Sequence, residues 1–491
     1  MARGEITALD LADHYLSRIR SLDGALGAFV TVTPDLAVEQ AAAVTPTTAA
    51  IRPGALTGVP VAVKDMTATA GVPTRYGSAA FADQVPTVDA HVVTQLREAG
   101  LVLLGKTATS ELGLSVTLED PAGRPVGNPW DCHVSCGGSS GGAAVAVAAG
   151  LASVAHGTDL AGSVRVPAAM CGLVGYKPSR GLVSWGPDGL AMAGLATSGV
   201  LARTVADAAA LLDVLSQPVP GEPYPVPARP PRGYLDAVRQ PERTLGRRLR
   251  IGRFTTPVIA DAPVDQDCVQ AVDLVAEALS AIGHEVVPVR LPADPALGPA
   301  LDIVLAALVA AVPVRDERLL RVATRRWRRF GAEVSAVAYL QAVTVLQRAT
   351  AQAAAALAHV DLLLCPTLAT PHLPVDHGCQ CPTRRTGLRT RPRHREVSPY
   401  CAWFNITGAP ALSLPVAQDR HGLPVGVMLG GVSLAASGSV DARLLAVAGQ
   451  LERAMPWRDR HPEHWYAPAR PADQIEPPAS DRSRRHFAAR W

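Results

Sequence analysis

Short apolar runs alternate with helix-like segments along the first 216 residues of the chain. GVPVAV (58–63) and LVLL (101–104) have the composition of buried strands, and AHVVTQLREAG between them repeats apolar residues at helical spacing before a glycine. A further helix is expected after the glycine cluster at 137–142, and another over 205–216. This alternation predicts an α/β protein.

The alternation returns in the second half of the chain. LRIGRF and EVVPV are expected to be strands on either side of a helix at about 264–282, and three more strands are expected at 360–364, 411–416 and 425–431. At the N-terminus, MARGEITALDLADHYLSRIR reads as an amphipathic helix with Thr7 as its cap and Asp10 behind it.

Three segments lack this core pattern. Residues 217–248 are rich in proline and arginine and predict a surface excursion, 379–396 predicts a basic loop, and 469–491 predicts a polar, basic and disordered tail. A nucleic-acid arm is the alternative for the last two, but aromatic residues that could stack on bases are missing from the basic loop. We predict a single domain over 1–468 that contains the first two segments.

Composition narrows the classes of partner. With 48% hydrophobic residues in 491, the chain can bury a large core, and a formal charge of +3 from 46 basic and 43 acidic residues gives no bulk reason to expect nucleic acid or an anionic membrane. The apolar run at 303–312 is too short to span a bilayer, and no secretory signal is visible. The balance favours a cytoplasmic protein with a small neutral ligand.

The eight cysteines predict reduced thiols rather than a disulfide framework. The CQC at 379–381 has the form of half a metal site, but no second cluster with zinc spacing accompanies it. We therefore expect no metal.

One segment matches a nucleotide-binding motif in sequence, but its residues do not suit a phosphate-binding loop. GLVLLGKT (100–107) matches GxxxxGK[ST], yet a phosphate-binding loop needs small or polar residues in a tight turn, and the middle residues here are Leu, Val, Leu and Leu. The segment predicts a buried strand, with Gly100 closing the preceding helix and Gly105 opening a turn.

Lysine is so rare in this chain that each one invites an explanation. Only three of the 46 basic residues are lysine, namely Lys64, Lys106 and Lys177. Lysine can lose its proton in a protein and arginine cannot, so a lysine acting as a base is one position that arginine could not fill. Lys64 ends an apolar strand, where burial would lower its pKa, and strand geometry would direct Asp65 to the opposite side.

Two serine-containing turns are candidates for a nucleophile. GGSSG (137–141) fits the GxSxG elbow with Ser139 as nucleophile, but NPWDCHVSC before it makes a poor strand. In GTDLAGSVRVP (157–167), Ser163 follows a small-residue turn whose N–H groups could form an oxyanion hole. Neither segment contains a histidine, so a neutral lysine is the base consistent with the composition.

Taken together, GVPVAVKD, NPW…GGSSGG and GTDLAGSVRVPAA resemble, in order and spacing, the hallmark of the amidase signature family, here at 58–180. The resemblance runs over roughly residues 4 to 465, through GKTATSEL, CGLVGYKPSRGLVS, GVLARTVADAAALLDVL, DLLLCPTLATP, FNITGAPALSLPV and GLPVGVMLGG. It implies an α/β fold in which helices cover both faces of a central, mostly parallel or mixed, twisted sheet. It also implies an amidohydrolase with a Ser–cisSer–Lys triad that needs no cofactor.

The resemblance assigns a role to each matching position. Ser163 is the implied nucleophile, Lys64 the base, and Ser139 the bridging serine after a cis peptide bond. The family's oxyanion donors correspond to four backbone N–H groups, those of Leu160, Ala161, Gly162 and Ser163. Four more motif residues are expected to support the loops: Ser140, Thr158, Asp159 and Arg165. Alanine at 161, where the family often has glycine, suggests a slightly narrower acyl pocket.

Three alternatives stay open at this point. A tRNA-dependent amidotransferase subunit shares the fold, although Val166 stands where such subunits typically carry glutamine. A scaffold that lost catalysis is the second, which the intact triad residues disfavour, and an enzyme that transfers the acyl group to an amine is the third. The sequence does not identify the amide, and core packing is the better expectation for Trp185, Trp327, Trp403 and Phe404. Similar proteins are commonly homodimers.

Overall fold

The computed structural model describes most of the chain. Described are residue 1 and residues 5–44, 56–119, 125–187, 189, 191–292, 294–375, 392–432 and 439–463. The tail at 469–491, the CQC at 379–381 and most of the predicted basic loop lie outside these residues. No helix among the described residues is long and apolar enough to cross a membrane.

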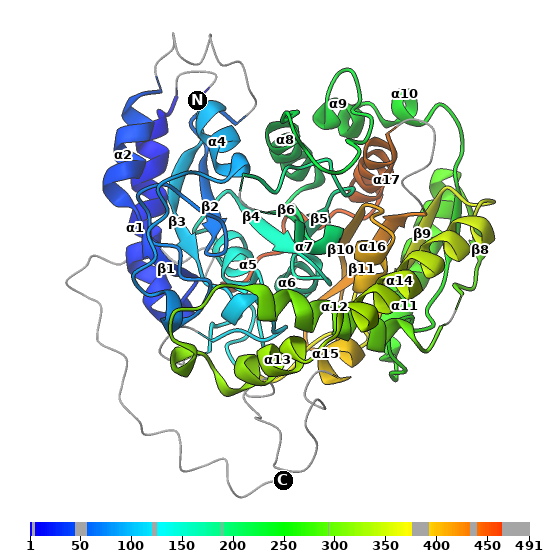
Figure 1. Ribbon diagram of the computed structural model, residues 1–491. Helices are drawn as coiled ribbons and strands as arrows, with labels where there is room; N and C mark the ends of the chain where they lie inside the picture. The colour runs from blue at the N-terminus through cyan, green and yellow to red at the C-terminus, as the bar shows by residue number, and fades with distance from the viewer. Residues whose placement is uncertain are drawn as a thin grey trace, which may run out of the picture.

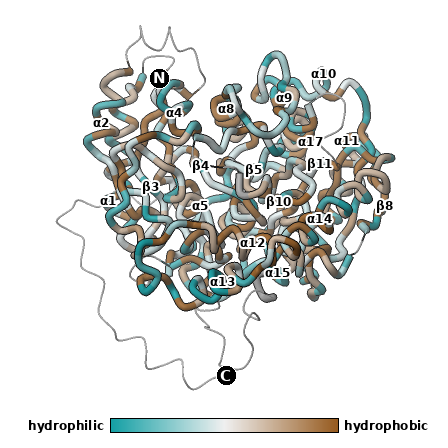
Figure 2. Tube along the Cα trace, viewed as in Figure 1, coloured by the Kyte–Doolittle hydropathy of each residue, from teal (hydrophilic) through white to brown (hydrophobic). Residues whose placement is uncertain are grey.

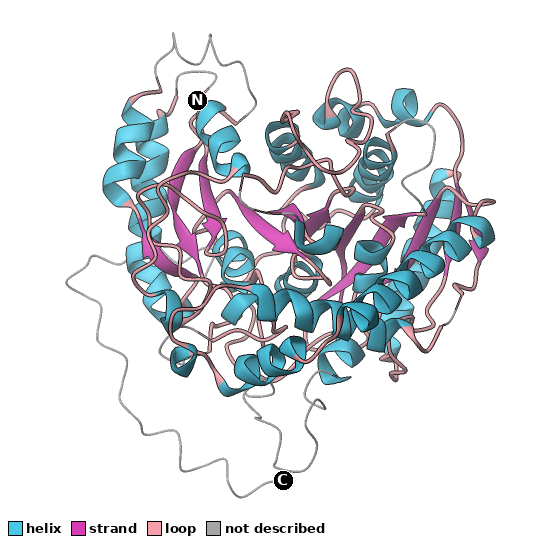
Figure 3. Ribbon diagram, viewed as in Figure 1, coloured by secondary structure: helices cyan, strands magenta, loops and turns pink. Residues whose placement is uncertain are grey.

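An 11-stranded sheet runs through the middle of the molecule (Figure 3). Its strand order is β1-β3-β2-β4-β6-β5-β10-β11-β9-β7-β8. The strands have these bounds: β1 Phe29–Val32, β2 Pro60–Lys64, β3 Val102–Thr107, β4 Val154–Asp159, β5 Val174–Lys177, β6 Thr197–Ala202, β7 Arg250–Arg253, β8 Glu285–Pro288, β9 Leu362–Pro366, β10 Ala411–Gln418 and β11 Pro424–Gly431.

The sheet is mixed. Parallel pairing joins β3, β2 and β4 near one edge and β9, β7 and β8 at the other, whereas the remaining neighbours are antiparallel. The sequence predicts a mostly parallel or a mixed sheet, and the observed sheet is mixed. The two outer parallel groups are built by helical crossovers, as parallel strands require.

Helices cover both faces of this sheet (Figure 1). One face packs on α4 His91–Glu98, α8 Val205–Leu215, α9 Tyr234–Arg239, α10 Pro241–Leu245, α11 Gln266–Ile282 and α17 Val440–Ala454. The other packs on α1 Ala8–Leu26, α5 Gly141–Ala148, α6 Arg165–Cys171, α12 Leu297–Ala311, α14 Ala336–Ala356 and α16 Cys401–Ile406. The shorter or more peripheral helices are α2 Pro34–Ala42, α7 Ala191–Gly194, α13 Val322–Ala332 and α15 Pro392–Val397, with 3-10 turns η1 Ala79–Phe81, η2 Glu111–Gly113 and η3 Glu317–Leu319.

The apolar pattern explains where the helices lie. Figure 2 shows a largely apolar segment along α12, and α12 packs against both α13 and α14. A helix that is apolar on most sides must be covered on most sides. The amphipathic α1 begins as expected, because the Thr7 hydroxyl accepts from the Asp10 N–H and the Asp10 carboxylate accepts from the Thr7 N–H.

The glycine in GKT does not open a turn, so that expectation is wrong. β3 continues through Gly105 and Lys106 to Thr107, within a buried strand. Gly105 has φ +147°, and a Cβ there would lie 2.1 Å from the Thr31 carbonyl oxygen of the neighbouring strand. The glycine is explained by close contact with β1, and no phosphate-binding loop forms there.

The proline- and arginine-rich segment is exposed or half-buried over 217–233 and then forms two short helices. Within 217–248, α9 and α10 form, and Tyr234 is completely buried. α9 packs against α8 and α17, and α10 packs against α17, so a sparse apolar pattern concealed a helix pair that packs on these two helices. Likewise, the end of the predicted basic loop is helical, since α15 begins at Pro392.

Candidate active site

Lys64 ends β2 in the interior of the sheet, between β3 and β4. Its side chain is fully buried, and Nζ donates to Ser139 Oγ at 2.7 Å and to Thr158 Oγ1 at 2.8 Å. The strand end thus holds an amine against the first serine of GGSSG. The structure brings together a lysine and a serine that lie 75 positions apart in the sequence.

Burial lowers the pKa of Lys64 to about 7, although the carboxylate of Asp159 acts in the opposite direction. The neighbouring Asp65 does not hold the ammonium charged. Its carboxylate instead accepts from the Arg75 N–H at 3.1 Å and lies 3.6 Å from Lys106 Nζ. A substantial fraction of Lys64 is therefore neutral near pH 7, which is the state a general base requires.

Ser139 follows a cis peptide bond with Gly138, at the turn that leads into α5. A Cβ at position 138 would lie 2.7 Å from the Ser115 carbonyl oxygen, so only glycine fits beside that loop. The next residue, Ser140, is fixed by donation from its Oγ to the Thr158 carbonyl at 3.1 Å. Its N–H donates to the Ser163 carbonyl at 3.0 Å, which ties the two serine turns together.

Ser163 lies on the loop between β4 and α6 and lines a cavity together with Gly138. Within the described part of the chain, its hydroxyl makes no hydrogen bond, so the expected link between Ser139 and Ser163 is not closed in this structure. Hydrogen bonds of a catalytic relay are often long in the free enzyme and tighten when substrate binds. The geometry accordingly contains the contact between Lys64 and Ser139 that the expected relay requires.

The loop N–H groups differ in availability. The N–H of Gly162 donates to Asp159 Oδ1 at 2.8 Å and is therefore occupied, in contrast to the expectation that it faces the oxyanion. No hydrogen bond from the N–H of Leu160, Ala161 or Ser163 to another described residue is present. Those three N–H groups remain as donors at the cavity wall.

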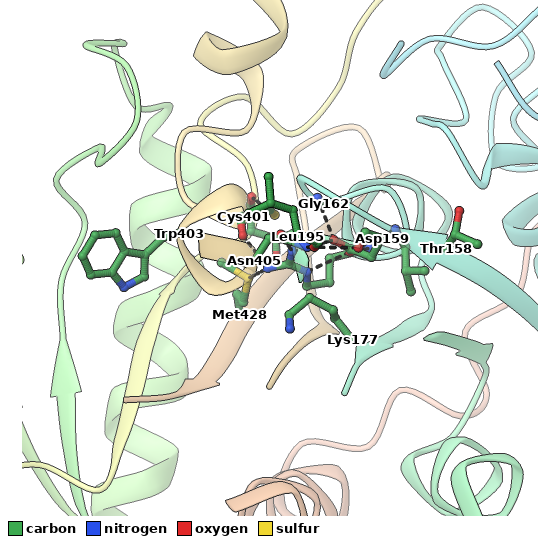
Figure 4. A network of polar contacts seen from close by, with 12 residues as sticks. Thr158, Asp159, Gly162, Lys177, Leu195, Cys401, Trp403, Asn405 and Met428 are labelled. Atoms are coloured by element: carbon green, nitrogen blue, oxygen red, sulfur yellow. Dashed lines mark hydrogen bonds and ion pairs between the residues drawn. The ribbon is translucent and has the colours of Figure 1, made fainter. Parts of the chain in front are cut away.

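A buried ion pair supports this loop, as Figure 4 shows around Asp159. Arg165 donates from Nη2 to Asp159 Oδ1 at 2.8 Å and from Nε to Oδ2 at 3.0 Å, with both side chains fully buried. Burial opposes ionisation of Asp159, but the adjacent guanidinium prevails and holds the pKa of that carboxyl below its ordinary value. The fixed carboxylate in turn binds the N–H groups of Gly162 and Val164.

Asn405 completes this network, and the sequence analysis missed it. Its Nδ2 donates to Asp159 Oδ1 and to the Leu195 carbonyl, both at 3.0 Å, while its Oδ1 accepts from Arg165 Nη2 at 2.7 Å. One signal in the sequence could have indicated this residue: Asn405 is a single amide side chain in the otherwise apolar segment CAWFNI. Its partner Arg165 lies 240 positions away, so the sequence could not show the pairing.

The ion pair carries the first prediction. Arg165→Met is expected to reduce the free energy of unfolding by about 3–5 kcal/mol, because Asp159 would stay buried without its counter-charge. Urea denaturation at pH 7 measures the loss. The double variant Arg165→Met/Asp159→Asn is the control and should recover part of it. A loss below about 1 kcal/mol would mean that the pair behaves like an exposed one.

The other two lysines are also buried, with different partners. Lys106 Nζ donates to Thr74 Oγ1 at 2.6 Å and to the Thr67 carbonyl at 2.8 Å, and Lys177 Nζ donates to the Pro178 carbonyl at 2.9 Å. Burial lowers the pKa of Lys177 to about 7 as well. All three lysines that the sequence analysis singled out are therefore buried. Of the three, only Lys64 donates a hydrogen bond to a serine.

The aromatic residues divide between core and cavity. Trp403 and Phe404 are buried in the core, and Trp327 packs against Leu112 and α12. Trp185 instead lines a second cavity with Tyr76, which opens beside Thr158. Core packing was thus the right expectation for three of the four aromatic residues.

The cysteines and the potential metal ligands add little to the site. The six described cysteines are free thiols. Asp131, Cys132 and His133 place ligand atoms within 4.8 Å of one another at the surface, in the part of the chain that the structure covers. The sequence analysis did not single out this group, and it does not contact the serines or Lys64.

Comparison with known proteins supplies independent evidence. A sequence profile described as Amidase matches residues 10–435. The 6-aminohexanoate-cyclic-dimer hydrolase of Pseudomonas sp. (strain NK87) is 34% identical over 487 residues, covering 94% of this chain and 94% of that protein. A glutamyl-tRNA(Gln) amidotransferase subunit of Thioalkalivibrio sulfidiphilus (strain HL-EbGR7) is 34% identical over 494 residues, covering 94% of this chain and 97% of that protein.

A solved structure agrees with these matches. The structure of 6-aminohexanoate cyclic dimer hydrolase complexed with substrate has a TM-score of 0.84 and 30% sequence identity, and the match covers 94% of this chain and 97% of that one. The similarity extends over nearly the whole of both chains. The chain therefore belongs to the amidase signature family and is an amidase, an enzyme that hydrolyses the C–N bond of amides.

Proposed function

We propose that this amidase acts through an acyl-enzyme on Ser163, with Lys64 as the base and Ser139 as the bridge between them. The observation that carries the proposal is the 2.7 Å hydrogen bond from a fully buried Lys64 to Ser139, beside the cavity that Ser163 lines. Burial gives this lysine a pKa of about 7, so it can accept a proton at neutral pH.

In the acylation step, neutral Lys64 takes the proton of Ser139, and Ser139 takes the proton of Ser163 as that oxygen attacks the amide carbon. The tetrahedral intermediate collapses when its C–N bond breaks and the relay returns a proton to the leaving nitrogen. Water then attacks the ester carbon with the same relay as base. The products are a carboxylic acid and ammonia or an amine, and Ser163 is regenerated.

The N–H groups of Leu160, Ala161 and Ser163 are the oxyanion donors in this proposal. They have no other partner among the described residues, whereas the N–H of Gly162 is bound to Asp159. A preorganised donor of this kind contributes about 2.7–4 kcal/mol to the transition state in other hydrolases. Asp159 and Arg165 act indirectly, because they fix the loop that presents those donors.

The role of an amidotransferase subunit remains the second candidate, because two such proteins are among the relatives. Val166 is completely buried in the apolar core beside the loop, so it presents no polar group to a substrate. Purification of the chain alone, with amide hydrolysis intact, would favour the independent enzyme. Hydroxylamine added to the assay would reveal transfer of the acyl group to an amine as a hydroxamate product.

A serine-directed fluorophosphonate tests the proposed function directly. We expect one phosphonyl adduct, on Ser163, identified by peptide mass spectrometry after the native chain is incubated with the probe at pH 8. Ser139 makes a hydrogen bond to Lys64 and is the matched alternative within the same site. An adduct on Ser139 alone, or no adduct on the folded protein, would contradict the assignment.

The remaining expectations stand as parts of the same proposal. One continuous sheet supports the single domain over 1–468. Free thiols support a cytoplasmic location. A homodimer is proposed because similar proteins are commonly homodimers. The substrate is a small amide, and the mechanism above uses only side chains and backbone groups of this chain.

A further inference from the structure

The turn that precedes the GGSSG segment carries three different metal-ligating side chains. Asp131, Cys132 and His133 offer a carboxylate oxygen, a thiol sulfur and an imidazole nitrogen, and these atoms all lie within 4.8 Å of one another. No other such group is found among the residues that the structure describes. No metal was expected from the sequence because zinc ligands were sought as two separated clusters, and three adjacent residues do not have that spacing.

The three ligand atoms are close enough to share one ion. Three points no more than 4.8 Å apart have a common centre within about 2.8 Å of each, since 4.8 divided by √3 is 2.8. Zn²⁺ lies about 2.3 Å from a thiolate sulfur and about 2.0–2.2 Å from a nitrogen or oxygen ligand, so side-chain movements of less than about 1 Å close the site. Cys132 and His133 are exposed, which leaves room for this adjustment and gives an ion a path from solvent.

Hydrogen bonds hold the turn in this shape. Asp131 Oδ1 accepts from the His133 N–H at 2.8 Å, and the Asp131 carbonyl accepts from the Val134 N–H at 3.1 Å. The His133 carbonyl accepts from the Val375 N–H at 3.1 Å, which anchors the turn to a distant segment. Because a carboxylate has about four lone-pair sites on two oxygens, Asp131 can support the turn and bind a cation at the same time.

A second turn with the same hydrogen bond shows what Cys132 adds. In the segment 419–421, Asp419 Oδ1 accepts from the His421 N–H, also at 2.8 Å. The middle residue there is Arg420, whose Nε donates to His421 Nε2 at 3.1 Å and so occupies that ring nitrogen. A guanidinium stays charged in proteins and repels a metal cation. Of these two turns, the one at 131–133 is therefore the one that suits a metal.

The ligand atoms determine the class of metal. Thiolate ligands select metals such as zinc, whereas Mg²⁺ and Ca²⁺ prefer sites made of oxygen atoms. Zn²⁺ accepts sulfur, nitrogen and oxygen, and it binds three protein ligands with water in the fourth position. We propose that Asp131, Cys132 and His133 bind one Zn²⁺, with water as the fourth ligand. This inference does not rest on the proposed function, because no hydrogen bond of Lys64 involves this turn.

Cobalt is a suitable probe of this site, because a thiolate bound to Co²⁺ gives an intense absorption band in the ultraviolet. The native chain is freed of metal with a chelator, kept reduced by a reagent without thiols, and titrated with Co²⁺ near neutral pH. We expect the band to saturate at one Co²⁺ per chain. Added Zn²⁺ should remove the band, because such ligands bind Zn²⁺ more tightly than Co²⁺.

Variants of the two turns identify the ligands. Cys132→Ser and His133→Gln should each weaken Co²⁺ binding by at least about tenfold, since the loss of a residue that only supports a ligand already costs 10–100-fold. Cys132→Ser should also abolish the ultraviolet band. His421→Gln is the matched control, because it removes an imidazole from a turn with the same hydrogen bond. It should bind Co²⁺ as the native chain does, and circular dichroism confirms that each variant is folded.

The CQC at 379–381 is the rival site, because its sequence has the form of half a metal site. The double variant Cys379→Ser/Cys381→Ser should keep both the band and the affinity of the native chain. Alkylation by iodoacetamide gives a second measurement. Zn²⁺ should slow the alkylation of Cys132, the exposed thiol among the six described cysteines, by about tenfold or more, as peptide mass spectrometry can show.

The opposite results would overturn the inference. A band that survives in Cys132→Ser, or that disappears in the double variant, would place the metal elsewhere, as would protection of Cys379 and Cys381 instead of Cys132. An unchanged affinity in His133→Gln, or an equal loss in His421→Gln, would refute the set of three ligands. Weak binding that is equal in the native chain and every variant would mean adsorption to the surface. None of these results alters the labelling of Ser163, so the proposed function is tested separately.

Discussion

Ser163→Ala is expected to reduce amide hydrolysis on the order of 10⁶-fold, the loss seen when other serine hydrolases lose their nucleophile. The reason is that no other hydroxyl has both a position at the cavity wall and neighbouring free N–H groups to stabilise the oxyanion, within the residues that the structure describes. Steady-state turnover and fluorophosphonate labelling measure the effect. Both should fall to background.

The fold should tolerate this change. The Ser163 hydroxyl makes no hydrogen bond to another described residue, so the thermal midpoint is expected to stay within about a degree or two, as for other substitutions that remove no structural contact. Ser139→Ala is the matched control, since it removes the bridge and keeps the nucleophile. It should retain slow labelling of Ser163. If Ser163→Ala kept substantial turnover while Ser139→Ala lost all labelling, the elbow mechanism on Ser139 would replace the one proposed.

Lys64→Met is expected to lower kcat/KM by about 10²–10⁴-fold, the usual contribution of a general base. Methionine fills a similar volume but cannot accept a proton. Lys177→Met is the matched control, because Lys177 is equally buried and burial also lowers its pKa to about 7, yet its Nζ contacts the Pro178 carbonyl instead of a serine. Lys177→Met should retain most of the activity, and similar losses in both variants would refute a specific role for Lys64.

The pH dependence follows from the same pKa. Activity of the native enzyme should rise with pH through about 7, as the Lys64 ammonium loses its proton and becomes a base. Lys177→Met should keep this profile. A profile of kcat/KM that stays flat between pH 6 and 8 would exclude Lys64 as the titrating base.

Stability should also rise with pH, but over a higher range than activity. The folded-state pKa of Lys64 lies below its ordinary value of 10.5, so the unfolded chain binds more protons between about pH 7 and 10.5. Burial of this lysine therefore destabilises the fold most below pH 7, and the penalty disappears as pH rises towards 10.5. Both methionine variants should be more stable than the native chain at pH 7, and the gain should shrink at pH 10, as thermal unfolding can measure.

Much of the site followed from local sequence. The strand before Lys64, the glycines around Ser139 and the small-residue turn before Ser163 are each explained by neighbours within a few positions, and their order along the chain resembled one family closely. The alternation of apolar runs indicated the α/β fold for the same reason, since periodicity reports burial on one face of an element. The capped helix that begins after Thr7 is a further local feature that the structure contains.

Other features depended on contacts between distant segments. The turn expected at Gly105 is absent, because β3 continues through this glycine where β1 approaches closely. Within 217–248, residues 217–233 are exposed or half-buried, whereas Tyr234 is buried because α9 packs against α8 and α17. Local composition could not reveal either partner.

The sequence by itself therefore determined the candidates for the proposed chemistry: three lysines in a chain that otherwise uses arginine, and two serines on glycine-containing turns. Only the tertiary structure decided which of three buried lysines meets a serine and that Asp159 occupies the N–H of Gly162. The physical reason is that pKa values, free donors and cavity walls depend on distances between segments far apart in the chain. Periodicity and motifs describe neighbours along the chain, whereas desolvation and hydrogen bonding act between neighbours in space.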